Sequence, residues 1–343
     1  MTIHLRKLVL TLLLASTLFL QVSFSHAKEQ VQSKPIKLRT LHMPYIAAAP
    51  FHIAEEEGYF TEQGLQVEFV KMADAVVGLP ALIKGDLDVI PDVFYPSYLN
   101  AIARGARIRI VADRGYLVST GCASVAIMAR RTLVEEGKLS RVSQLKGKRV
   151  AMTQGSSILG YILEKVLSQD SLTLTDVETV FLQMPARLDA FAKGSIDVTL
   201  GSEPWVTRML QAGHAVIWMP INHIVPNFQW AFLIYGPTLL ENNPEAGKRF
   251  MVAYLKAVRQ YNQGKTKRNL EIIAKHTGLD RELLQKCCWR AFQNDGQINI
   301  DSILDCQSWA LQKGFLDKTV SPNQFWDPSF IEHANKVLGR LEK

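Results

Sequence analysis

Two stretches, LIKGDLDVIPDVFYPS at positions 82–97 and FAKGSIDVTLGSEPWVTR at 191–208, follow the same order of features. Each begins with the end of an apolar helix and a Lys-Gly pair. An Asp, a short apolar strand and a loop with polar and aromatic residues follow. The pairs Gly85/Gly194 and Asp88/Asp197 are separated by the same number of positions. The repetition predicts that the chain builds one strand-and-loop unit twice.

The flanking sequence extends this repeat. Apolar alternation, interrupted by Gly and Pro, predicts the order strand–helix–strand–helix–strand–helix–strand over 36–115 and again over 146–219. Strands that alternate with helices favour parallel sheets covered by helices on both faces. A further strand is expected at 228–236, followed by helices that pack back onto the first half. The prediction is an α/β fold with two lobes.

The N-terminus has the pattern of a secretory signal. Arg6 and Lys7 precede the apolar run 8–24, and Ser25-His26-Ala27 supplies small residues at a cleavage site. A membrane anchor is the alternative, but the run is short for a span, which needs about 20 residues. We expect cleavage after Ala27, a disordered leader over 28–35 and a periplasmic location.

Charge and cysteine content narrow the function classes. The chain of 343 residues has 39 Lys and Arg against 32 Asp and Glu, spread without a basic cluster that would indicate nucleic-acid binding. The four cysteines lack zinc-site spacing, so no metal or cofactor is expected. Export permits a disulfide. Cys306 with Cys287 or Cys288 is the expected pair, buried thiols are the alternative, and Cys122 is expected to be free.

Ligands of open α/β sheets bind beyond the carboxyl ends of the strands, so the loops there predict the site. The loop TQGSS at 153–157 opens a helix, where backbone N–H groups can hold an anion, although N-capping explains the same serines. Aromatic residues in these loops can sandwich a flat ligand. The expected ligand-binding residues are Pro44, Tyr45, Asp92, Phe94, Tyr95, Thr120, Gln154, Gly155, Ser156, Ser157, Arg187, Glu203, Trp205, Asn227 and Trp230.

Two pairs of acids have different expected roles. Asp92 and Glu203 follow equivalent strands, where they would accept hydrogen bonds from a ligand and repel a bare sulfonate or nitrate. Helix capping is the alternative for Glu203, and Arg187 could offset either acid or bind an anion. Asp88 and Asp197 precede the strands, at the opposite end, where turn capping is expected. No catalytic residue is predicted.

Five segments carry a resemblance to a known family: AAAPFHIAEEEGYFTEQGLQVEFV, GLPALIKGDLDV, LKGKRVAMTQGSS, AFAKGSIDVTLGSEPWVTRMLQAG and NPEAGKRFMVAYLKAVR. Together they cover most of 36–262 and resemble periplasmic substrate-binding proteins of the nitrate, sulfonate, taurine and pyrimidine-precursor type, the SsuA/THI5-like or NMT1/THI5-like family. The resemblance implies a class II clamshell with lobe I at 36–121 plus 228–343 and lobe II at 122–227.

The same resemblance implies a function. A monomer would capture a small polar solute, heteroaromatic or sulfonate-like, and deliver it to an inner-membrane ABC permease with a cytoplasmic ATPase. One alternative is a sensor-associated binding protein that regulates a membrane receptor. The other is an enzyme related to pyrimidine-phosphate synthases, which use a cysteine-rich iron-binding signature. KCCWRAF at 286–292 resembles that iron-binding signature only superficially and lies in a different part of the chain.

Overall fold

The computed structural model describes residues 34–43, 45–72, 75–153 and 155–339. The predicted signal peptide and most of the predicted leader lie outside these ranges. Within them, no helix combines the length and apolar character that crossing a membrane requires. Residues from Pro35 onward form one compact unit.

The first sheet combines strands from both ends of the described chain. Its order is β2 (Leu65–Val70), β1 (Ile36–Leu41), β3 (Val89–Val93), β12 (Ala231–Tyr235) and β4 (Arg109–Asp113). β1 is parallel to β2 and β3, whereas β12 is antiparallel to both β3 and β4. The four repeat strands thus share one direction, and a returning strand is inserted among them.

The second sheet follows the same plan. Its order is β10 (Ala215–Pro220), β6 (Val125–Arg130), β9 (Val198–Ser202), β7 (Arg149–Met152) and β8 (Glu178–Phe181). β7 is parallel to β8 and β9, and β6 is antiparallel to β9 and β10. In both sheets the third repeat strand, β3 or β9, lies between the first repeat strand and the inserted antiparallel strand. The sequence repeat and the α/β fold class are confirmed.

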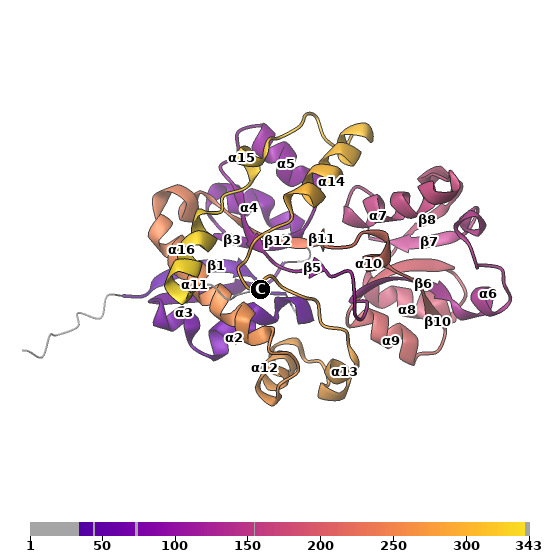
Figure 1. Ribbon diagram of the computed structural model, residues 1–343, viewed down its shortest axis with the longest axis horizontal. Helices are drawn as coiled ribbons and strands as arrows, with labels where there is room; N and C mark the ends of the chain where they lie inside the picture. Colours follow the sequence, from indigo (N-terminus) through magenta and orange to yellow (C-terminus); the bar gives the residue numbers. More distant parts are fainter. Residues whose placement is uncertain (1–33, 44, 73–74, 154, 340–343) are drawn as a thin grey trace, which may run out of the picture. The chain divides into compact units, whose positions relative to one another are not determined.

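Helices beside the first sheet come from both ends of the chain (Figure 1). α11 packs on α2 and α16, and buried residues of α11 share one apolar cluster with β1, β2 and α2. The expected return of the C-terminal helices is therefore confirmed. The helices are α2 (Ala49–Glu56), α3 (Tyr59–Glu62), α4 (Leu79–Lys84), α5 (Pro96–Ala103), α11 (Pro244–Tyr261), α12 (Lys267–Thr277), α13 (Arg281–Lys286), α14 (Ile300–Gln312), α15 (Pro322–Phe325) and α16 (Ser329–Leu338).

Shorter helices accompany the second sheet and the connections. They are α6 (Arg131–Glu135), α7 (Ile158–Leu167), α8 (Met184–Ala192), α9 (Trp205–Gln211) and α10 (Ile221–Ile224). Short 3-10 turns occupy Ile46–Ala48, Val76–Gly78, Val142–Leu145, Ser168–Asp170 and Leu174–Asp176, and Thr238–Asn242 is π-helical.

Two expected elements differ from the structure. The single helix expected over 50–64 is two helices, because Gly58 adopts φ 73°, a left-handed conformation that ends α2 before α3 begins. The strand expected over 177–184 ends at Phe181, and Pro185 lies in the first turn of α8. Arg187, an expected ligand-binding residue, therefore lies in a helix.

Two segments connect the sheets. They contain β5 (Tyr116–Leu117) and β11 (Phe228–Gln229), which pair antiparallel. All strands of the first sheet lie outside 122–227, and all strands of the second lie inside that range. The lobe boundaries at 121/122 and 227/228 stay a prediction.

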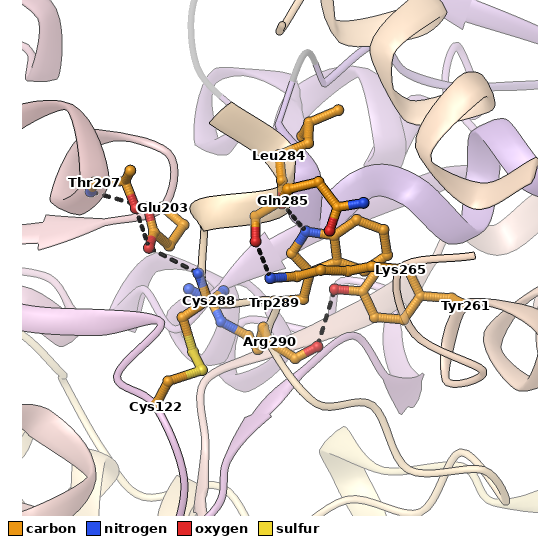
Figure 2. Close-up of a disulfide and its surroundings, with 10 residues drawn as sticks. All are labelled: Cys122, Glu203, Thr207, Tyr261, Lys265, Leu284, Gln285, Cys288, Trp289 and Arg290. Atoms are coloured by element: carbon orange, nitrogen blue, oxygen red, sulfur yellow. Dashed lines mark hydrogen bonds between the residues drawn. A yellow bond between two sulfur atoms is a disulfide. The ribbon is translucent and has the colours of Figure 1, made fainter. Parts of the chain in front are cut away.

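The disulfide differs from the expectation. Cys122 pairs with Cys288, 166 positions away (Figure 2). Cys287 and Cys306 are free and buried, as in the alternative of buried thiols. The helix expected over 280–293 ends at Lys286. The chain beyond it is irregular, which carries Cys288 to the connection after β5. The predicted pairing of Cys306 and the predicted free Cys122 are both wrong.

Candidate functional site

A cavity of about 400 Å³ lies where loops from both sheets meet. Tyr45 lies beyond the end of β1, and Asp92 belongs to the end of β3 in the first sheet. Thr153 follows β7 and Glu203 follows β9 in the second sheet. The cavity is thus at the carboxyl ends of the repeat strands, where open α/β sheets bind ligands.

About half of the predicted site residues reach this cavity. Those that line it are Tyr45, Asp92, Tyr95, Ser157, Glu203, Trp205 and Trp230. Those that are described but do not line it are Phe94, Thr120, Gly155, Ser156, Arg187 and Asn227. Pro44 and Gln154 lie outside the described residues. The ligand contacts themselves stay a prediction.

Arg187 has a structural position rather than a place on the cavity wall. Its side chain is fully buried and donates to the carbonyl oxygens of Leu182 and Leu200, both at 2.9 Å. It also donates to the hydroxyls of Thr199 and Thr153, at 3.1 and 2.8 Å. Burial lowers the pKa of Arg187 to about 10. The guanidinium holds the ends of strands together, so its predicted contact with a ligand is not supported by its position.

The other predicted site residues that are described but lie outside the cavity lining are buried in the core, exposed in the connections between the sheets, or placed before α7. Phe94 is buried in the apolar core. Thr120 and Asn227 are exposed in the two connections between the sheets, and the Asn227 carbonyl accepts a hydrogen bond from Asn299. Gly155 and Ser156 precede the true N-cap, Ser157, whose hydroxyl accepts a hydrogen bond from the Leu159 N–H at 3.3 Å. The N-capping interpretation of this loop is confirmed.

Glu203 links two parts of the protein through its carboxylate. It accepts hydrogen bonds from the N–H and the hydroxyl of Thr207, at 3.1 and 2.8 Å, in the first turn of α9. It also accepts one from the Cys288 N–H at 2.9 Å (Figure 2). The helix-capping alternative for Glu203 is therefore confirmed, and its oxygens already serve protein donors.

Asp92 is likewise engaged within the protein. It accepts hydrogen bonds from the Val93 N–H at 2.8 Å and from the Tyr98 hydroxyl. Asp88 and Asp197 do not line the cavity. Asp88 accepts from the Arg39 N–H, and Asp197 forms ion pairs with Arg130 and Arg149. Both acids therefore link neighbouring strands, since Arg39 belongs to β1, Arg130 to β6 and Arg149 to β7. The predicted turn capping is not among the hydrogen bonds that these two acids accept.

Two arginines on the cavity wall were missed by sequence reasoning. Arg114 and Arg290 are both buried, at 3% and 8% exposure, and both line the cavity. Burial lowers the pKa of Arg114, and burial together with the charge of Arg114 lowers the pKa of Arg290 to about 9. Arg114 directly follows β4, so the strand-end rule could have found it. No sequence pattern indicates Arg290.

Aromatic rings form much of the remaining wall. Trp230 is buried, and the Arg290 guanidinium lies 5.2 Å from the centre of its ring. Trp205 is partly exposed, with the Arg208 guanidinium 4.8 Å from its ring. Tyr45 is 45% exposed at the rim. Such a wall suits a ligand with a flat or apolar part.

A group of histidines lies behind the cavity wall. His42 lines the cavity, and its ring centre is 6.1 Å from that of the buried His52. His52 stacks on His276, with ring centres 4.5 Å apart, and His276 contacts Glu56 at 2.7 Å. Burial first, and then the charge of His276, lower the pKa of His52 to about 4. Among the described residues, no group of three or more His, Cys, Asp or Glu could hold a metal ion.

The low pKa of His52 predicts that this one group destabilises the folded state in acid. Because the unfolded chain binds this proton near pH 6.5 and the folded chain only near pH 4, the contribution of His52 to stability is complete above about pH 6.5 and is lost as the pH falls to about 4. The loss from this group should be about 3 kcal/mol. We expect His52→Gln to shift the difference in unfolding free energy between pH 7 and pH 4, measured by urea unfolding, by about 3 kcal/mol relative to the wild type. The exposed His214→Gln should leave it unchanged, and an equal effect of both variants would contradict the assignment.

The sequence and the fold were both compared with those of known proteins. A family model described as NMT1/THI5 like matches residues 46–263, more than half of the chain. No curated protein matches the sequence.

Several solved structures have a similar fold. The ligand-binding component of an ABC-type import system from Staphylococcus aureus, solved with zinc bound, has a TM-score of 0.71 at 15% identity, over 88% of this chain and 99% of that one. The alkanesulfonate-binding protein SsuA from Xanthomonas axonopodis pv. citri, bound to MOPS, has a TM-score of 0.67 at 18% identity, over 86% and 99%. The desulfurization enzyme DSZB has a TM-score of 0.66 at 14% identity, over 88% and 99%. At these identities the likeness concerns the two-lobe fold alone.

Proposed function

Because the chain belongs to the NMT1/THI5-like family, we propose that it is the periplasmic solute-binding component of an ABC-type importer. One observation carries the proposal: strand ends of both sheets and aromatic rings line the same cavity of about 400 Å³. That volume suits a small polar solute with a flat or apolar part. A solute that touches both walls favours the state in which they are close, which is how binding would drive closure.

A thermal-shift screen tests this proposal. The panel contains amines, sulfonates, pyrimidines and aromatic acids, each added to the purified chain. A ligand at 100 times its Kd that binds only the folded form stabilises it by about 2.7 kcal/mol, which raises the melting temperature by a few degrees. We expect at least one class to do so. If no member of the panel shifts the melting temperature, solute binding is not supported.

Trp205→Ala provides a test at one residue. The ring lines the cavity and would cover the ligand, so we expect the variant to bind the best solute of the panel at least about tenfold more weakly. Isothermal titration calorimetry measures the change. Trp218 lies in β10 and does not line the cavity, so Trp218→Ala is the matched control and should bind normally. Near-normal affinity of Trp205→Ala would exclude this wall from the binding site.

A further inference from the structure

Two buried guanidinium groups on the cavity wall lack an anionic partner within the described chain. The Nε atoms of Arg114 and Arg290 are buried and make no hydrogen bond there. The ion pairs of arginine among the described residues involve other arginines. Buried cations are costly unless they are paired. Both residues also line the cavity, so each guanidinium has unused donor capacity beside a space that can hold a small molecule.

The nearest carboxylates do not take up this capacity. Asp113 acts electrostatically on both arginines but does not line the cavity. It accepts hydrogen bonds from the N–H groups of Gly115 and Gln293, both at 2.8 Å, and from the Gln229 amide at 2.7 Å. Burial raises the pKa of Asp113 to about 7, so its negative charge is incomplete near neutral pH. Asp92 and Asp113 offset part of the charge of Arg114, but burial has the larger effect on that group.

Arg290 is held by the segment that the disulfide anchors. Cys288, two positions earlier, is bonded to Cys122, and its N–H donates to Glu203 beside the second sheet (Figure 2). Trp289 stacks on Tyr261, with ring centres 5.2 Å apart, and its indole N–H donates to the Leu284 carbonyl. The Arg290 carbonyl accepts from the Tyr261 hydroxyl at 3.0 Å.

Two close neighbours, Gly115 and Trp230, also restrict the Arg290 side chain beside the cavity. Gly115 has φ 124°, and a Cβ there would lie 2.6 Å from the Arg290 Cδ. The absence of a side chain at Gly115 thus makes room for the arginine. On the other side, the Trp230 ring faces the guanidinium. The Gly115 backbone, the Trp230 ring and the Cys122–Cys288 disulfide together restrict the position of the Arg290 side chain.

We propose that Arg114 and Arg290 form a subsite for the acid group of an organic anion, and that the Cys122–Cys288 disulfide positions Arg290 in it. Guanidinium groups match carboxylates and sulfonates through charge-assisted hydrogen bonds. The aromatic wall receives the remainder of the anion. This inference rests on the proposed solute-binding function and adds the chemical class of the solute.

The test uses matched acids and amides on the full disulfide-bonded protein. Benzoate and benzamide, and benzenesulfonate and benzenesulfonamide, differ mainly in charge at pH 7.5, and the two pairs separate carboxylate from sulfonate preference. We expect at least one acid to bind about tenfold or more tighter than its amide by calorimetry. Arg114→Gln and Arg290→Gln should each remove most of that difference, while the exposed Arg104→Gln should keep it.

Two further readouts separate positioning from stability. Each Gln variant removes an unpaired buried charge, so its melting temperature without ligand should equal or exceed that of the wild type. Cys122→Ser/Cys288→Ser should weaken acid binding in the wild type but cost no further affinity in Arg290→Gln. Equal added losses in both backgrounds would show that the disulfide does not act through Arg290. If the Gln variants do not fold, Arg114→Lys and Arg290→Lys provide the test. These variants keep the positive charge but lose the paired N–H donors of the planar guanidinium, so they should still bind the acid more weakly than the wild type.

The outcomes distinguish this subsite from solute binding itself. If neutral or cationic members of the wider panel raise the melting temperature and neither acid binds better than its amide, the acid subsite is wrong and the solute-binding function stands. If no member of either set binds, the solute-binding function fails as well.

Discussion

Phe250→Ala is expected to lower the free energy of unfolding by about 3–5 kcal/mol, as truncation of a fully buried Phe does. The Phe250 ring is fully buried in α11 and contacts the rings of Phe51 and Phe60, near the N-terminus, with centres 6.1 and 5.2 Å away. It also contacts Tyr235 of β12. The substitution therefore tests whether the C-terminal helices complete the core of the first sheet. Urea unfolding followed by circular dichroism gives the value.

The chain offers a control with the same chemical change. Phe181 ends β8 and is 63% exposed. Phe181→Ala should change the free energy of unfolding by less than about 0.5 kcal/mol. Comparable losses in the two variants would contradict the packing of α11 against the N-terminal elements.

Gly160→Ala is expected to destabilise the protein by about 1–3 kcal/mol and to displace the loop 155–157. A Cβ on Gly160, in the first part of α7, would lie 1.8 Å from the Gly155 carbonyl oxygen, so either the helix or the loop must move. Ser157 of this loop lines the cavity, and therefore the affinity for the best solute of the panel should fall as well. Thermal unfolding and calorimetry measure the two effects.

Gly155→Ala is the matched control for this substitution. A Cβ on Gly155 would have no heavy atom within 4 Å. The free energy of unfolding of Gly155→Ala should therefore differ from that of the wild type by less than about 0.5 kcal/mol. A tolerated Gly160→Ala would mean that the loop does not approach α7 as closely as described. Equal losses in both variants would point to backbone flexibility rather than to a close contact.

The fold was largely predictable because local patterns repeat. Gly85 and Gly194 end helices or turns before β3 and β9, and both strands are the third of their sheets. A strand at the position of β12 was predicted, but the insertion of β6 and β12 into the two sheets was not. Their antiparallel pairing depends on how the chain passes between the sheets, and no local propensity encodes that passage.

The site was predictable only where a strand-end loop reaches the cavity directly. Asp92 at the end of β3, and Glu203 and Trp205 just beyond β9, line it. Arg187 was expected after a strand end in the same way, but it lies in α8 and its side chain turns into the protein, where it donates to buried carbonyl oxygens that need donors. Position near a strand end does not determine the direction of a long side chain.

The disulfide and Arg290 required tertiary information. Cys122 and Cys288 are far apart along the chain, and spacing cannot pair them. The irregular path after Lys286 places both Cys288 and Arg290, yet KCCWRAF alone reads as a continuation of the helix. The C-terminal segment thus supplies Arg290 to the cavity wall, and the sequence repeat does not predict this contribution.

A crystal structure of the protein with the tightest-binding solute of the panel would show whether loops of both sheets hold the solute. We expect one solute molecule in the cavity of about 400 Å³, in contact with Trp205 or Glu203 beside the second sheet and with residues after β1 or β3 of the first sheet. A solute bound elsewhere on the protein, or held by the loops of one sheet only, would contradict this expectation.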